Sequence, residues 1–78
     1  MQLAYRPWFP EGTANPLTDR EREVALAASR GMQTEQIAAY MGLAIGTIRT
    51  HKSHIRSKLK VHTMAGAVSL CLRRGWIS

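Results

Sequence analysis

The sequence holds one cysteine, no proline beyond Pro16 and no acidic residue beyond Glu35. Cys71 cannot form an internal disulfide and has no second thiol with which to hold zinc. We therefore expect Cys71 to pack as a small hydrophobic residue, and the protein to occupy a reducing compartment. No apolar run approaches the ~18 residues that span a bilayer. Arg6, Pro7 and Pro10 interrupt any N-terminal targeting pattern. These absences predict a cytoplasmic protein without a membrane partner.

Catalytic and metal-binding patterns are also missing. His51 and His54 are three residues apart with no third ligand at a recognisable spacing, which favours a structural or phosphate-facing His51 over a metal site. Cys71 and the histidines form no nucleophile and base pattern, and 78 residues are too few to enclose a pocket. We therefore expect no enzyme, metal, cofactor or small-molecule ligand.

Positive charge is concentrated in the second half of the chain. The net charge is +6, all five acids lie within the first 35 residues, and the cations that follow them are Arg49, Lys52, Arg56, Lys58, Lys60, Arg73 and Arg74. Solvated cations are usually interleaved with glutamates, so this segment favours a polyanionic partner such as nucleic acid. Charge alone leaves open an ordinary solvated face or an anionic membrane surface.

Proline, glycine and capping residues divide the chain into an arm and four helices. Residues 1–16 contain all three prolines and are typical of an irregular N-terminal arm, whose Trp8 and Phe9 either dock on the body or are ordered only by outside contacts. Helices are predicted at about 18–30, 35–41, 45–60 and 63–74. Short connections between them predict an all-α fold, a compact four-helix bundle over residues 17–78.

Local signals set the expected helix ends and the buried faces. Thr18 and Glu21 form a capping box, Thr34 and Thr63 are predicted caps, and the helices are expected to stop at Gly31, Gly42 and Gly75. On the third helix an apolar stripe is expected to face the core, with Arg49, Lys52, Arg56 and Lys60 beside or opposite it. The stripe consists of Ile45, Ile48, Ile55 and Leu59.

Residues Thr34 to Ser53 form a pattern typical of a helix-turn-helix. Ala38 is small where two helices would cross, Gly42 follows four residues later at the turn, and Ile48 follows six residues after that to fill the angle between the helices. Alone the pattern is moderately specific. Followed by an acid-free basic helix, it indicates DNA binding.

Several segments resemble the LuxR-type (FixJ/GerE-type) DNA-binding domain over about Leu17 to Ile77. They are Leu17-Thr18-Asp19-Arg20-Glu21-Arg22-Glu23-Val24, Gly31, Ile37-Ala38, Gly42-Leu43, Thr47-Ile48-Arg49-Thr50-His51, Ile55, Lys58-Leu59, Val61 and Gly75-Trp76-Ile77. The resemblance implies a transcription regulator that binds paired half-sites on duplex DNA. Its third helix would enter the major groove, and its fourth would form a homodimer contact.

The resemblance also assigns roles to individual positions. Base reading falls on Arg49, Thr50 and Ser53, which share the outer face near the start of the third helix, where a groove-inserted helix meets base edges. The phosphate-binding candidates are Thr34, Thr47, Lys52, Arg56 and Lys58. The dimer candidates on the last helix, which the pattern leaves as either core or interface, are Met64, Val68, Cys71 and Leu72.

The sequence departs from the family pattern in several places, one of which is Gln36 in place of a usual Glu. Ala44 stands where a Ser or Thr usually caps the recognition helix. Ala25 and Ala27 replace larger residues, a volume that Trp8, Phe9 or Trp76 is expected to fill. Met64 and Gly66 alter the surface of the last helix.

Two other functions compete with a dimeric regulator at the bacterial nucleoid. One is an interaction module that pairs with a larger regulator through the last helix. The other is region 4 of a sigma factor, which shares the opening motif but lacks the Thr-x-Arg-x-His segment and would recruit RNA polymerase.

Overall fold

A computed structural model describes residues 14–78, which form four α-helices and no strand. They are α1 (Asp19–Ser29), α2 (Thr34–Met41), α3 (Ile45–Leu59) and α4 (Met64–Arg74). The predicted all-α four-helix fold is confirmed over this range. The arm aromatics Trp8 and Phe9 lie outside the described residues. None of the four helices is long and apolar enough to cross a membrane.

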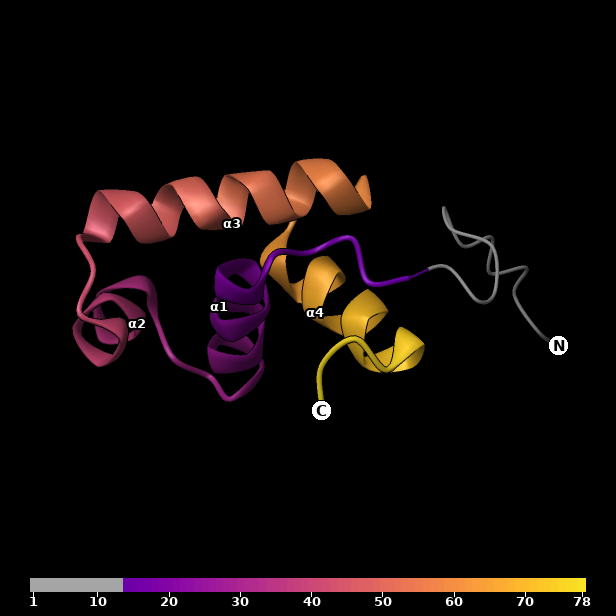
Figure 1. Cartoon of the computed structure of the whole chain (residues 1–78), viewed down its shortest axis with the longest axis horizontal. Helices are drawn as coiled ribbons and strands as arrows, with labels where there is room; N and C mark the ends of the chain where they lie inside the picture. The colour runs from indigo at the N-terminus through magenta and orange to yellow at the C-terminus, as the bar shows by residue number, and fades with distance from the viewer. Residues whose placement is uncertain (1–13) are drawn as a thin grey trace, which may run out of the picture.

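Two central helices organise the bundle. α1 and α3 each pack against all three other helices, whereas α2 and α4 do not contact each other. Figure 1 shows α3 lying across α1 and the neighbouring helices, with α2 below its beginning and α4 below its other end. One side of α3 therefore faces the other helices, and its opposite side is left open along its length.

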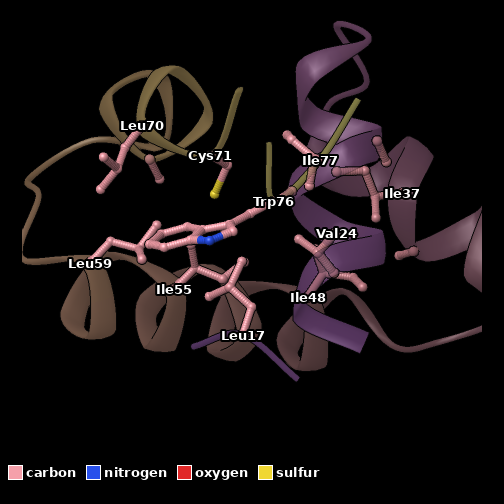
Figure 2. Close-up of a cluster of buried hydrophobic side chains, with 14 residues drawn as sticks. Leu17, Val24, Ile37, Ile48, Ile55, Leu59, Leu70, Cys71, Trp76 and Ile77 are labelled. Atoms are coloured by element: carbon pink, nitrogen blue, oxygen red, sulfur yellow. The ribbon is translucent and has the colours of Figure 1, made fainter. Parts of the chain in front are cut away.

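The core contains the aliphatic side chains that the helical spacing predicts and one large aromatic ring. Ile48, Ile55 and Leu59 are fully buried on the inner side of α3, together with Val24 from α1. Figure 2 shows the ring of Trp76 between the helix that carries Cys71 and the one that carries Ile55 and Leu59. Trp76 belongs to the same buried cluster as Ala25 and Ala27, which supports the prediction that it occupies volume left by small residues of α1.

The helix ends follow the predicted chemistry with one correction. At α1 the Thr18 hydroxyl accepts from the Glu21 amide at 3.1 Å, and the Glu21 carboxylate accepts from the Thr18 amide at 2.9 Å, which confirms the capping box. Thr63 caps α4 in the predicted way. The prediction that Thr34 caps α2 is wrong. The helix begins at Thr34 itself, and the Gln33 amide donates to Oε1 of Gln36 at 2.7 Å, while the Thr34 hydroxyl accepts from Lys52.

The predicted inner stripe of α3 is shorter than expected. Ile45 lies in the first turn, beyond the edge of the core, and keeps 40% of its surface exposed. The buried stripe of α3 therefore begins at Ile48.

Candidate nucleic-acid interface

The helix-turn-helix unit is α2, the turn at Gly42 and α3. Ala38 and Ile48 are buried where α2 meets α3. Gly42 has φ of +68°, the left-handed conformation that glycine adopts without steric cost, and the Leu43 amide donates to the Ala38 carbonyl at 3.0 Å. This backbone geometry ends α2 and turns the chain directly into α3. The three positions that define the sequence pattern, Ala38, Gly42 and Ile48, thus have the predicted environment.

The outer side of α3 carries the three predicted base-reading residues. Arg49, Thr50 and Ser53 are all exposed, on the side of the helix opposite Ile48, Ile55 and Leu59. Because residues i, i+1 and i+4 share half of a helix surface, the three side chains lie next to one another. The first half of α3 thus presents a guanidinium and two hydroxyls on one accessible surface.

One flank of α3 is bound to α1. The Lys58 ammonium donates to Oε1 of Glu21 at 2.7 Å and to the Pro16 carbonyl at 3.5 Å, and Nδ1 of His54 lies 4.0 Å from Oε2 of Glu21. Glu21 is only 3% exposed, so this carboxylate sits between the start of α1 and the second half of α3. The contact fixes α3 on the bundle through a charge pair in addition to apolar packing.

The Glu21 carboxyl is held in its ionised form by its neighbours. Burial alone raises the pKa of this carboxyl, but hydrogen bonds from Lys58 and Thr18, together with the charge of Lys58, outweigh burial. The net pKa of Glu21 lies below its ordinary value. A carboxylate that caps α1 and also binds Lys58 therefore stays charged in the folded protein.

The opposite flank of α3 is bound to α2. The Lys52 ammonium donates to the Thr34 hydroxyl at 2.9 Å, which joins two predicted phosphate-binding residues from different helices. Thr47 is exposed and Arg56 is half-buried. Lys58 differs from the other candidates because its ammonium is engaged by Glu21, and a phosphate would have to share it.

Sequence reasoning missed the pairing of Glu21 with Lys58. Both residues lie within the motifs that were noticed, but they are 37 positions apart and no local periodicity connects them. Only the absence of acids near Lys58 could have suggested a search for its partner among the few carboxylates of α1. The partner was determined by how α3 crosses α1.

The predicted dimer surface on α4 needs one correction. Cys71 is fully buried in the core, where burial raises the pKa of its thiol, so it cannot contribute to an exposed interface. It is the packed hydrophobic residue that the sequence suggested. Leu72 is 50% exposed, and Met64 and Val68 are half-buried in a shallow groove that Ala28 and Ser29 of α1 also line.

The described part of the chain offers no candidate metal site. Residues 14–78 contain no group of three His, Cys, Asp or Glu side chains placed to hold an ion. The candidate surface is instead polar, cationic and open, along the side of α3 that faces away from the bundle.

Comparison with known proteins agrees with this arrangement. The model of the family described as bacterial regulatory proteins, luxR family, matches residues 15–71. The chain is 40% identical over 63 residues to the transcriptional regulatory protein DesR of Bacillus subtilis, covering 81% of this chain and 32% of DesR. It is 42% identical over 50 residues to the transcriptional regulatory protein UhpA of Escherichia coli, covering 64% of this chain and 26% of UhpA.

A solved structure has the same fold. The crystal structure of the response regulator ChrA, from a heme-sensing two-component system, superimposes with a TM-score of 0.76 at 29% identity, covering 83% of this chain and 32% of ChrA. This chain spans about a third of the length of DesR and ChrA. The relatives named above are all described as regulators, as the residues predicted. The chain therefore belongs to the luxR family of bacterial regulatory proteins, and residues 15–71 form its helix-turn-helix DNA-binding domain.

Proposed function

We propose that this protein binds specific duplex DNA sequences by inserting the first half of α3 into the major groove. The observation that carries the proposal is the exposure of Arg49, Thr50 and Ser53 side by side on the outer surface of a rigidly supported helix. The major groove is wide enough to admit an α-helix and presents a distinct donor and acceptor pattern for each base pair.

The three residues would read bases in different ways. The Arg49 guanidinium matches O6 and N7 of guanine as a two-pronged donor, a contact that contributes about 1–3 kcal/mol of discrimination. Thr50 offers a methyl group to a thymine methyl and a hydroxyl to a base-edge acceptor. Ser53 has a single short hydroxyl and discriminates weakly. Arg49 therefore dominates the proposed sequence preference.

Phosphate contacts would flank this surface and fix its register. Lys52 and Thr34 are joined at 2.9 Å, so an ammonium and a hydroxyl are already positioned to bind one phosphate together. Thr47 and Arg56 extend the same role along α3. Lys58 remains a candidate for sharing a phosphate, although its contact with Glu21 favours a structural role. These contacts would contribute affinity and salt dependence without selecting sequence.

We further propose that the protein acts as a homodimer on paired half-sites at the bacterial nucleoid, with α4 as the contact. The shallow apolar groove between α4 and α1, lined by Met64, Val68 and Leu72, supports this surface. Bound at a promoter, such a dimer would influence transcription through RNA polymerase or a larger regulator. The family match favours this function over a sigma-factor domain.

The decisive experiment is selection of bound sequences from random duplex DNA, performed with the wild type and with Arg49→Ala. We expect the wild type to select a motif and the variant to lose preference at one base-pair position while keeping the rest. Uniform weakening across all sequences would make Arg49 a phosphate contact. A wild type that binds no duplex at low salt would contradict the proposed function and favour an interaction module.

A further inference from the structure

Lys60 is the residue at which α3 ends, and its backbone is left-handed. Its φ is 58°, and the other residues with positive φ in the described range are the glycines Gly31, Gly42 and Gly75. A side chain with a Cβ is strained in this conformation, whereas glycine adopts it without steric cost. Glycine at position 60 would therefore adopt the observed backbone conformation with less strain than lysine does.

The Lys60 ammonium has no polar partner among the described residues. Lys60 is exposed, and no hydrogen bond or ion pair to its ammonium is found among residues 14–78. Arg56 lies four residues earlier on the same side of α3, so its like charge repels Lys60. A cation near a helix C-terminus also interacts favourably with the helix dipole, but Arg56 and Lys58 already occupy the last turn.

Lys60 continues the row of residues that begins with the base-reading surface. Arg49, Ser53, Arg56 and Lys60 follow one another at spacings of four, three and four, which places them along one side of α3. At a rise of about 1.5 Å per residue, Lys60 lies about 16 Å along the helix from Arg49. In helix-turn-helix proteins the beginning of the recognition helix meets base edges, and the far end of such a helix can contact the DNA backbone.

We propose that Lys60 is a further phosphate-binding residue that extends the DNA contact to the far end of α3. This inference rests on the proposed function, since it requires that α3 lies in the major groove. A phosphate at this point would relieve the repulsion between Arg56 and Lys60. The strain at Lys60 is then tolerated because the ammonium acts in the bound state, where glycine could not replace it.

The test separates the backbone effect from the charge effect with three variants. Lys60→Gly removes both the strain and the charge, Lys60→Gln removes only the charge, and Lys60→Arg keeps the charge. Binding to a labelled random-sequence duplex of about three helical turns is measured by fluorescence anisotropy over a series of salt concentrations. Thermal unfolding of each free protein is measured in parallel.

We expect Lys60→Gly and Lys60→Gln to lower the slope of log K against log salt by about 0.9 per bound chain, and Lys60→Arg to keep it. Lys60→Gly should also raise Tm by roughly 2–8 °C, so that a more stable protein binds DNA less well. If the wild type binds and Lys60→Gly and Lys60→Gln retain its slope and affinity, the inference is wrong and the proposed function stands. If the wild type does not bind, both are wrong.

Discussion

The Lys58 ammonium lies 2.7 Å from Oε1 of Glu21, which joins the last turn of α3 to the first turn of α1. The same carboxylate accepts from the Thr18 amide at 2.9 Å. One buried glutamate thus completes a helix cap and also binds the helix that carries the proposed DNA-binding surface. Its removal should affect the position of α3 as well as the stability of α1.

Replacement of Glu21 by glutamine should lower the free energy of unfolding by about 1–3 kcal/mol, because the Lys58 ammonium would lose its charged partner. Urea unfolding followed by circular dichroism measures the change. Glu23→Gln is the matched control, since Glu23 lies on the same helix but is well exposed beside Arg20. Equal and small effects of both substitutions would show that the contact between Glu21 and Lys58 adds nothing to stability.

Stability should fall in acid through Glu21. Its pKa is lowered in the folded protein relative to the ordinary value of 4.5, so the unfolded chain binds the proton more readily. The stabilisation is fully present above the unfolded value and is lost as pH falls through the lower folded-state pKa. Unfolding free energies measured from neutral pH into this acid range should therefore decline more steeply for the wild type than for Glu21→Gln. Parallel curves would rule out a lowered pKa at this carboxyl.

An N-cap placed on α3 should stabilise the protein. Ala44 precedes the helix with extended backbone angles and offers no side-chain cap hydrogen bond. A serine hydroxyl at this position can accept from a free amide of the first turn, and we expect Ala44→Ser to raise the unfolding free energy by about 0.5–1 kcal/mol. Ala44→Val, which adds bulk without an acceptor, is the control for thermal or urea unfolding. A gain with valine equal to that with serine would point to packing in place of capping.

A charge placed on the exposed part of α4 should weaken self-association without unfolding the chain. Leu72 is half exposed beside the groove shared with α1, so Leu72→Glu should preserve the helical circular dichroism spectrum. In a homodimer through this face the two carboxylates would be brought together, raising the dissociation constant by about tenfold or more. Analytical ultracentrifugation measures it.

The control for that substitution is Tyr40→Glu, because Tyr40 is an exposed residue of α2, a helix that does not contact α4. It should leave association unchanged. A wild type that is monomeric both free and on DNA, or a Tyr40→Glu effect as large as that of Leu72→Glu, would exclude α4 as the homodimer contact.

The predictions that depended on short-range geometry agree with the structure. The Thr18 and Glu21 capping box and the left-handed Gly31, Gly42 and Gly75 need only their neighbours within a few residues. The sequence was ambiguous where one side chain could form either of two hydrogen bonds. Thr34 has the chemistry of a cap, but its hydroxyl binds Lys52 and the helix begins one residue earlier than predicted.

The sequence by itself determined the four helices, the turn between α2 and α3 and the outward placement of Arg49, Thr50 and Ser53, since helical periodicity assigns each side chain to a face. Only the tertiary structure decided that Cys71 is buried while Leu72 is exposed, that Ile45 extends past the core and that Glu21 meets Lys58. Those outcomes depend on where one helix crosses another. The crossing is a property of the assembled bundle, and no single segment encodes it.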